Sequence, residues 1–267
     1  MTAEKIPIEK NSVQETLLVP LYGRKMCAEK FPELYHDDSA KKLCERIDYD
    51  FSEIDKKNQA FMYEFGALEA AMRQLDIMWE IDDYLKKYPC ATIVNLGCGL
   101  DQTGRVCDNG TCKIVNVDFP NIIEVREQLL PVGEREKNIP RDLTDHSWMD
   151  EVDASEGVLL FAAGVFHYFK RDAVRDLVVT MAQKFPGGRL IFDTVGKLGL
   201  KMMISQSLSA MGISEVSGLF YVRDAERELR WSDKIQVTSR DYMLGYHDMK
   251  SPGIRGSHRF LARVGDR

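Results

Sequence analysis

ATIVNLGCGLDQTGRVCDNGTCKIVNVD, residues 91–118, is the stretch of the chain that decides the fold. It begins with a short apolar run, Ala91–Leu96, which is typical of a parallel strand buried on both faces. The run ends in Gly-Cys-Gly, and two glycines one residue apart let a chain turn sharply and let a ligand approach the backbone without meeting a Cβ atom. A second apolar run, Lys113–Val117, ends in Asp118. The stretch therefore predicts a strand, a glycine turn and a second strand that ends in a carboxylate.

Two more apolar runs follow, at Gly157–Ala163 and Arg189–Phe192, and residues 138–141 are a candidate for a further strand. Segments that read as helix or loop separate these runs. Such alternation predicts an α/β fold with a doubly wound, mostly parallel, Rossmann-like sheet. In these sheets ligands bind outside the carboxyl ends of the strands, near the point where the strand order reverses. We therefore expect the chemistry directly after each run.

The first third of the chain has a helical pattern. Residues 11–50 read as helices with a polar break at 36–39, and from Asn58 to Tyr88 apolar residues recur every three or four positions. Pro89 ends this long amphipathic helix. No repeat or Pro/Gly/Ser-rich linker divides the chain. We expect one compact protein, with residues 1–88 forming a helical cap and lead-in helix and residues 89–267 forming the α/β core.

Composition narrows the class of protein. The 267 residues carry 42 acidic and 36 basic side chains, a net charge of −6, and Lys and Arg are interspersed with Asp and Glu. This balance argues against a nucleic acid partner. The charged N-terminus, MTAEKIPIEK, lacks the apolar centre of a signal peptide, and the longest apolar run, Gly157–Phe166, is about half of what a membrane span needs. We expect a cytoplasmic protein that binds no membrane.

The six cysteines are expected to be free thiols, because the chain carries no export signal. Cys107 and Cys112 bracket the turn-forming tetrapeptide Asp-Asn-Gly-Thr, and no CxxC pair or nearby histidine completes a zinc set. We expect no metal site.

The glycine turn after the first strand points to a ligand without a pyrophosphate. A dinucleotide fingerprint needs a third glycine three residues after the second, and Gln102 occupies that position. The alternative is a tight turn that binds no ligand.

Acidic residues follow the next strands. Asp118 is placed to accept hydrogen bonds from both hydroxyls of a ribose, and the alternative is a helix cap that leads into Pro120. Asp142, with neighbouring backbone groups, could read the amino edge of an adenine while Leu143 lies against its face. For Asp145 we prefer a helix N-cap. Gly164 again permits close backbone approach, and the aromatic residues after it would wall the place where a substrate meets the cofactor.

The chain resembles the leucine carboxyl methyltransferase family, and most of all its bacterial branch that includes tetracenomycin-type polyketide O-methyltransferases. Three segments carry the resemblance: Glu15–Arg24 (ETLLVPLYGR), Val94–Thr103 (VNLGCGLDQT) and Phe161–Phe169 (FAAGVFHYF). Val117–Pro120 and Phe185–Gly188 support it. The resemblance covers roughly residues 12–195 and implies a class I S-adenosylmethionine (SAM) methyltransferase, whose product from SAM is S-adenosylhomocysteine.

The resemblance also implies which residues bind SAM. Gly97 and Gly99 would lie beneath its methionine portion, Asp118 at the ribose, and Asp142 and Leu143 at the adenine. Arg73, on the helix before the first strand, would pair with the SAM carboxylate, as its forked guanidinium is suited to do. The full expected set adds neighbours of these residues: Arg73, Gly97, Cys98, Gly99, Asp118, Phe119, Asp142, Leu143, Ala163 and Gly164. The N-terminal helices would cover the site, with Thr16, Tyr22 and Arg24 as linings for the substrate.

The chain departs from the family pattern in two places. Family members commonly carry Glu directly before the glycine after the fourth strand, where this chain has Ala163. The fold also usually closes with an antiparallel strand after a long hairpin, but this chain ends in FLARVGDR, residues 260–267. Either the closing strand is absent or an earlier segment takes its place.

The expected reaction is methyl transfer from SAM to a carboxylate or hydroxyl oxygen of a small-molecule acceptor, without a metal. A carboxylate acceptor needs no base, whereas a hydroxyl benefits from one, and His167 is the candidate base. Tyr168, next to it, is the second candidate catalytic residue. The alternative for His167 is a structural histidine among aromatic residues. Two other classes of function stay open: a SAM-binding protein without catalysis and a nicotinamide-dependent oxidoreductase. The acceptor and the oligomeric state do not follow from the sequence.

Overall fold

The computed structural model describes residues 5–10, 12–58, 61–206 and 219–265. Its strands are β1 (Ile6–Pro7), β2 (Ile47–Asp48), β3 (Thr92–Leu96), β4 (Lys113–Asp118), β5 (Glu136–Pro140), β6 (Val158–Ala162) and β7 (Arg189–Phe192). Its α-helices are α1 (Leu18–Lys30), α2 (Asp38–Arg46), α3 (Ser52–Asn58), α4 (Phe61–Lys87), α5 (Thr103–Val106), α6 (Pro120–Leu129), α7 (Arg171–Lys184), α8 (Lys197–Gln206), α9 (Ala225–Glu228) and α10 (Gly256–Gly265). Three 3₁₀ helices, η1 (Val13–Leu17), η2 (His146–Glu151) and η3 (Phe166–Tyr168), complete the described elements.

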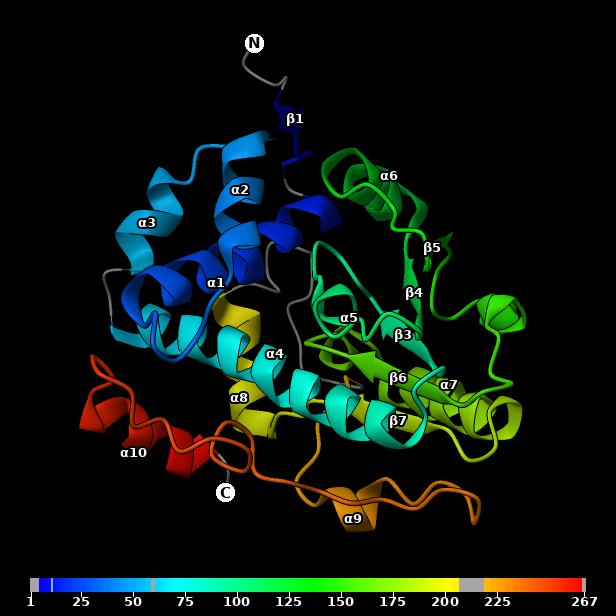
Figure 1. Ribbon diagram of the computed structural model, residues 1–267. Helices are drawn as coiled ribbons and strands as arrows, with labels where there is room; N and C mark the ends of the chain where they lie inside the picture. Colours follow the sequence, from blue (N-terminus) through cyan, green and yellow to red (C-terminus); the bar gives the residue numbers. More distant parts are fainter. Residues whose placement is uncertain (1–4, 11, 59–60, 207–218, 266–267) are drawn as a thin grey trace. The chain divides into compact units, whose positions relative to one another are not determined.

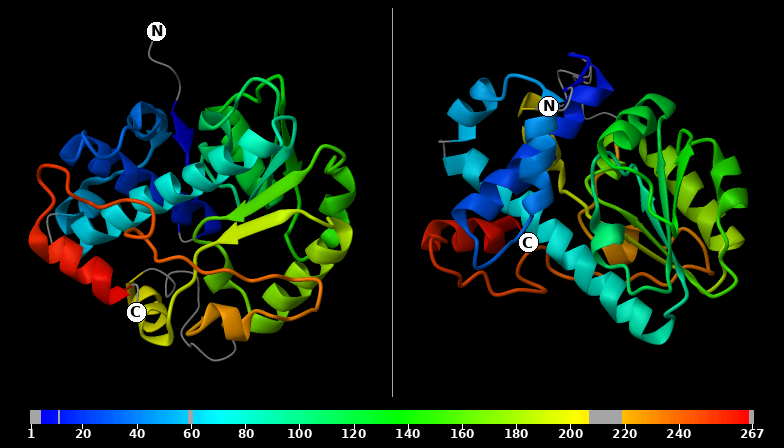
Figure 2. Two further views of the ribbon diagram at one scale, coloured as in Figure 1. Left: turned by 60° about the horizontal axis from the view of Figure 1, so that its bottom comes forward. Right: turned by 45° about the horizontal axis from the view of Figure 1, so that its top comes forward.

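A five-stranded sheet with the order β5-β4-β3-β6-β7 forms the centre of the α/β part, and all of its neighbouring strands run parallel (Figures 1 and 2). The chain proceeds outward from β3 through β4 to β5, and then returns to the other side of β3 to add β6 and β7. The strand order therefore reverses between β3 and β6, and the carboxyl ends of these two strands are the expected ligand edge. The predicted α/β fold with a doubly wound parallel sheet is confirmed.

The central strands β3, β4 and β6 are buried on both faces, which explains why they read as nearly continuous apolar runs. Alternate residues of a strand point to opposite faces. On one face Val94 and Val115 belong to a core cluster that also contains Leu177 and Met181 of α7. On the other face Ile114 and Ile93 lie against Gly104 of α5, where a Cβ atom would come within 3.2 Å of Ile114.

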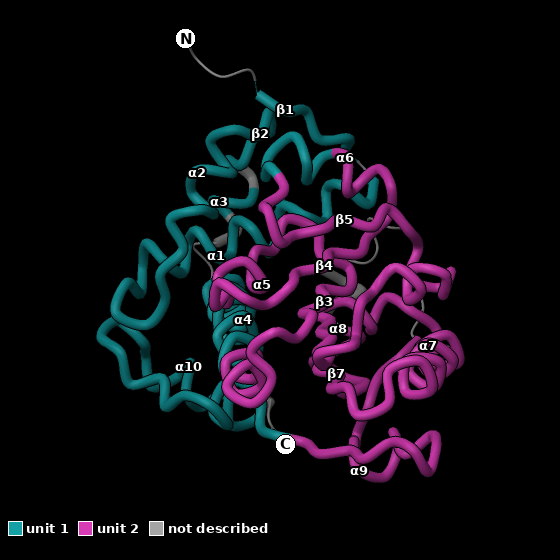
Figure 3. The backbone as a smooth tube through the Cα atoms, turned by 45° about the vertical axis from the view of Figure 1, so that its right-hand side comes forward, with its two compact units in different colours: residues 1–79, 125–131, 240–267 teal, residues 80–124, 132–239 magenta. Residues whose placement is uncertain are grey.

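The protein divides into two compact units (Figure 3). The helical unit contains residues 1–79, 125–131 and 240–267, and the α/β unit contains residues 80–124 and 132–239. These units do not follow the expected boundary at residues 88 and 89. The C-terminal residues 240–267 join the helical unit because Met243, Met249 and Ile254 pack in one core cluster with Phe65 and Met72 of α4.

A charged cluster around the buried Glu64 and His258 lies in the helical unit, and its cations Lys30 and Arg255 are partly exposed. Glu64 of α4 is 4% exposed and accepts a hydrogen bond of 2.6 Å from Lys30 of α1. His258 of α10, which is fully buried, places its Nε2 3.1 Å from Glu64 Oε1, and Arg255 Nη2 lies 3.7 Å from the same oxygen. The ring of His258 stacks on Phe61 at 4.8 Å between centroids. We call these residues the Glu64 cluster; it ties α1, α4 and α10 together.

The C-terminal segment is helical rather than extended: α10 covers residues 256–265. Among the described residues, the five-stranded sheet has no antiparallel strand, and one isolated antiparallel bridge joins Lys170 to Leu219. The closing strand usual in the family is therefore not found in the described part of the chain. Within that part, no helix has the length and apolar character to cross a membrane.

Candidate functional site

The turn after β3 has the backbone shape that the sequence predicts. Gly97 and Gly99 adopt φ values of +64° and +46°, in the left-handed region that favours glycine. Gly97 also has a steric requirement, because a Cβ atom there would lie 2.8 and 2.9 Å from the two methyl carbons of Val165. Between the glycines, Cys98 is 1% exposed and contributes its backbone to the turn. Gly97 and Cys98 both donate their N–H groups to the carbonyl of Val117 in β4, at 2.8 and 3.2 Å.

Asp118 joins the ends of β3 and β4. Its Oδ2 accepts a hydrogen bond of 2.8 Å from Gly99 N, and its Oδ1 accepts one of 2.8 Å from Phe119 N. The residue is half-buried, and each carboxylate oxygen has more than one lone-pair direction. The carboxylate therefore lies directly beside the glycine turn, where a sugar hydroxyl can donate to it.

The residues after β5 form a tight loop. Asp142 Oδ1 accepts hydrogen bonds from Thr144 N at 2.8 Å and from Thr144 Oγ1 at 2.9 Å. Leu143 is 4% exposed and belongs to the core cluster of the α/β unit. Asp145 caps η2 by accepting a hydrogen bond from Ser147 N, so its predicted role as a helix cap is confirmed. The structure places Asp142 in a loop at the same strand edge as Asp118.

Gly164 makes the turn after β6, with φ of +70°. Ala163 and Gly164 are half-buried, and they lead into η3. In η3, His167 is 4% exposed and its ring lies 4.5 Å from that of the half-buried Tyr168, between centroids. Such burial favours the structural interpretation of His167 over a role as a base, which would need access to the acceptor.

Two carboxylates at this edge were not among the predicted site residues. Asp193, directly after β7, accepts a hydrogen bond of 2.6 Å from Gly164 N. Asp101 accepts hydrogen bonds from the Asn95 side-chain amide at 2.9 Å and from the hydroxyl of Thr103 at 2.8 Å, and so holds the loop between β3 and α5. The rule that chemistry follows each strand could have found Asp193, since it is the first residue after the run Arg189–Phe192.

The remaining predicted residues belong to the helical unit. Arg73 is half-buried on α4. Thr16 donates to the carbonyl of Val13 at 2.6 Å, and the buried Tyr22 donates to Asp55 Oδ1 at 2.8 Å. Arg24 Nε lies 3.3 Å from Asp37 Oδ2, and both side chains are largely buried. These contacts lie within the helical unit, and the roles of these residues toward SAM or the acceptor stay predictions.

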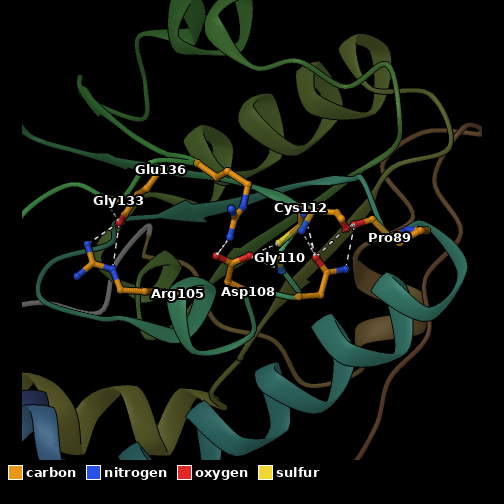
Figure 4. Close-up of polar contacts among 10 residues, drawn as sticks. Pro89, Arg105, Asp108, Gly110, Cys112, Gly133 and Glu136 are labelled. Carbon is orange, nitrogen blue, oxygen red and sulfur yellow. Dashed lines mark hydrogen bonds and ion pairs between the residues drawn. The ribbon is translucent and has the colours of Figure 1, made fainter.

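Hydrogen bonds hold the loop that contains Cys107 and Cys112 in place (Figure 4). Asp108 accepts hydrogen bonds from Gly110 N at 2.9 Å and from Arg135 at 2.6 Å. The Asn109 side chain accepts from Cys112 N and donates to the carbonyl of Pro89, both at 2.9 Å. Nearby, Glu136 accepts hydrogen bonds from Arg105 and from Gly133 N. Among the described residues, no group of three or more His, Cys, Asp or Glu side chains is arranged to hold a metal.

Comparison with known proteins agrees with this geometry. The family model for leucine carboxyl methyltransferase matches residues 21–182, which include the glycine turn, Asp118 and Gly164. The chain belongs to the leucine carboxyl methyltransferase family. It is therefore a SAM-dependent methyltransferase, as its sequence predicts.

Two named relatives match over nearly their whole length. The tetracenomycin polyketide synthesis O-methyltransferase TcmP of Streptomyces glaucescens is 26% identical over 268 residues, which cover 95% of this chain and 97% of that protein. The S-adenosyl-L-methionine-dependent methyltransferase dpfgK of Gibberella zeae is 27% identical over 287 residues, covering 99% of this chain and 93% of that protein.

Among solved structures, a DUF574 family protein from Streptomyces avermitilis has the same fold as this methyltransferase. The two superpose with a TM-score of 0.53 at 11% identity, over 78% of each chain. This likeness concerns the fold alone.

Proposed function

We propose that this methyltransferase transfers the methyl group of SAM to an oxygen atom of a small-molecule acceptor. The observation that carries the proposal is the contact between Asp118 and Gly99, which joins the carboxylate at the end of β4 to the glycine turn after β3, one of the two strands between which the strand order reverses. A relative named as a polyketide O-methyltransferase, matched along almost its whole length, supports oxygen as the acceptor atom.

The residues present fit SAM. Gly97, Gly99 and Gly164 have positive φ values at the ends of neighbouring strands, and at Gly97 the methyl groups of Val165 lie where a Cβ atom would be, so these turns present their backbone at the strand ends. Asp118 offers carboxylate oxygens for the ribose hydroxyls, and the loop at Asp142 and Leu143 lies at the end of the next strand, where the adenine would bind. Arg73 would pair with the carboxylate of SAM, and Phe119 and Cys98 would contribute backbone and packing.

The protein's own task is to align the methyl group of SAM with the acceptor oxygen and to exclude water. When bound, SAM supplies a sulfonium methyl group that is already a strong electrophile. Positioning of two reactants can lower a barrier by roughly 7 to 11 kcal/mol. We propose that Tyr168 lines the acceptor beside Gly164, and Thr16, Tyr22 and Arg24 stay predicted linings. The burial of His167 argues against a role for it in taking up a proton from a hydroxyl acceptor. A carboxylate acceptor requires no proton transfer.

The test is SAM recognition by the wild-type chain and by Asp118→Ala. We expect calorimetry to show S-adenosylhomocysteine binding that weakens by about tenfold or more in the variant, because hydrogen bonds to a charged group contribute about 1.5 to 3 kcal/mol. Asp172→Ala is the matched control, since Asp172 is an exposed carboxylate on α7. Unchanged affinity in Asp118→Ala would contradict the ribose assignment.

A thermal-shift comparison separates the other classes of function. We expect stabilisation by SAM and by S-adenosylhomocysteine but not by NADH, because a ligand stabilises only the folded state that binds it. Stabilisation by NADH alone would overturn the proposal. Formation of S-adenosylhomocysteine when metabolite extracts are added distinguishes a methyltransferase from a protein that binds SAM without catalysis.

A further inference from the structure

Asp193 lies at the carboxyl end of β7, beside the turn after β6. Its preceding residue, Phe192, is the register partner of Ala162, so Asp193 is next to Ala163 and Gly164 at the sheet edge. The Oδ1 atom of Asp193 accepts a hydrogen bond of 2.6 Å from Gly164 N. A bond from a backbone amide to a carboxylate is shorter and stronger than one between neutral groups.

This bond holds the turn after β6 from the side of β7. Gly164 lies beyond the last residue of β6, and its φ of +70° is a conformation that glycine leaves easily. The next residue, Val165, directs both methyl groups at Gly97, at 2.8 and 2.9 Å from the position that a Cβ atom would take there. The direction of the Val165 side chain depends on the shape of the Gly164 turn.

A chain of contacts thus crosses the ligand edge of the sheet. It runs from Asp193 after β7, through Gly164 and Val165 after β6, to Gly97 after β3. Gly97 in turn donates its N–H to Val117, the neighbour of Asp118 in β4. The carboxylate at one side of the sheet therefore supports the glycine turn two strands away.

We propose that Asp193 is a positioning residue for SAM binding: by holding the Gly164 amide it keeps Val165 against Gly97, and so keeps the β3 turn in the shape that receives the methionine portion of SAM. This inference rests on the proposed function. Asp193 acts through the turn, and its role is to accept a hydrogen bond rather than to carry a charge.

The experiment compares Asp193→Ala, Asp193→Asn and the wild-type chain. Calorimetry with S-adenosylhomocysteine measures the dissociation constant, and circular dichroism measures the melting temperature without ligand. We expect Asp193→Ala to weaken binding by about tenfold or more, because the Gly164 amide loses its acceptor. Asp193→Asn retains an acceptor oxygen and should bind within about threefold of wild type. Thr194→Ala, at the exposed neighbouring residue, should bind as wild type.

Val165→Ala tests the other end of the contact chain and serves if Asp193→Ala does not fold. It removes the methyl groups that touch Gly97 while Asp193 is intact, and it should also weaken S-adenosylhomocysteine binding. Wild-type affinity in Asp193→Ala, equal weakening in Asp193→Asn and Asp193→Ala, or wild-type affinity in Val165→Ala would each overturn the inference. A wild-type chain that does not bind S-adenosylhomocysteine would instead overturn the proposed function, and this inference with it.

Discussion

Carboxylates are used differently in the two compact units. In the α/β unit, Asp118 and Asp193 accept hydrogen bonds from the backbone N–H groups of glycines in turns at the strand ends. In the helical unit, Glu64 lies among the cationic side chain of Lys30, the imidazole of His258 and the guanidinium of Arg255. The first arrangement shapes backbone for a ligand, whereas the second holds together segments that are far apart in the sequence.

This difference predicts that changes at the strand ends affect ligand binding, and that changes in the Glu64 cluster affect stability. In a turn whose glycines have positive φ values, any other residue is strained, so a substitution there changes the shape of the turn. A half-buried ion pair can lose a partner without any change at a distant ligand site, and the loss then appears in the stability of the segments that the pair holds together.

The largest effect is expected from Gly97→Ala. A non-glycine residue in the left-handed region costs about 1 to 2 kcal/mol, and an added methyl group in a packed site costs about 1 to 3 kcal/mol. Their sum, about 2 to 5 kcal/mol, should appear in urea unfolding, together with loss of S-adenosylhomocysteine binding.

Gly110→Ala is the matched control for this substitution. Gly110 has φ of +88°, but a Cβ atom there would meet no atom within 4 Å, so only the backbone strain applies. We expect it to cost about 1 to 2 kcal/mol and to leave ligand affinity unchanged. Equal losses of stability and of binding in Gly97→Ala and Gly110→Ala would show that the contact between Val165 and Gly97 contributes to neither.

Glu64→Gln should have the next largest effect. It removes the charge that accepts a hydrogen bond from Lys30 and faces His258, and the expected loss is about 1.5 to 3 kcal/mol of unfolding free energy. S-adenosylhomocysteine affinity should stay near the wild-type value.

Glu29→Gln is the control for Glu64→Gln. Glu29 pairs with Lys25 at 3.4 Å on the surface of α1, where the Glu29 side chain is 50% exposed. Such exposed pairs contribute about 0.3 to 0.5 kcal/mol. If Glu64→Gln is no more destabilising than this control, the cluster does not hold the helical unit together.

The smallest effect concerns pH. Burial lowers the pKa of His258 from 6.5, with Glu64 acting to raise it and Arg255 and Lys30 acting to lower it. Arg255 N donates to His258 Nδ1 at 3.3 Å, so the neutral ring carries its proton on Nε2, facing Glu64. The unfolded chain takes up a proton near pH 6.5 while the folded chain does not. The contribution of the buried, neutral His258 ring to the unfolding free energy is therefore complete above pH 6.5. It is lost as the pH falls below that value.

Unfolding free energies at a series of pH values from 7.5 to 5 check this sign, using about half-unit steps around the histidine pKa. His258→Gln should flatten the decline, and His36→Gln, at an exposed histidine, should not. Some decline remains in His258→Gln, because burial also lowers the pKa of His247. Glu64, whose pKa burial raises but the hydrogen bond from Lys30 lowers below 4.5 overall, contributes at more acidic pH. A decline as steep in His258→Gln as in wild type would contradict this assignment.

The strand ends could be predicted from the sequence because their signals are local. Gly97, Gly99 and Asp118 each follow directly from a strand, and parallel strands bring their carboxyl ends to one edge whatever the rest of the chain does. The helix cap at Asp145 was predicted from another local signal, an acidic residue at a helix N-terminus. Asp193 was missed although it stands in an equivalent position, since no glycine or proline marks it.

The helical unit could not be predicted to the same depth. Nothing near Glu64 in the sequence indicates that Lys30 and His258 will meet it, since these contacts depend on tertiary packing between distant segments. The assignment of residues 240–267 to the helical unit was missed for the same reason. The short parallel pair of β1 and β2 was also not expected, because a strand of two residues leaves no periodic pattern.

The six cysteines of this methyltransferase differ in accessibility in a way that offers a practical handle. Cys27, Cys44, Cys98, Cys107 and Cys112 are buried, and Cys90 is exposed. Burial raises the pKa of Cys27 to about 12 and that of Cys44 to about 11, so these thiols are poor nucleophiles at neutral pH. A maleimide dye added to the native protein should therefore couple at Cys90 alone, in the short connection between α4 and β3. The wild-type chain thus carries its own site for a fluorescent reporter of ligand binding, without any substitution.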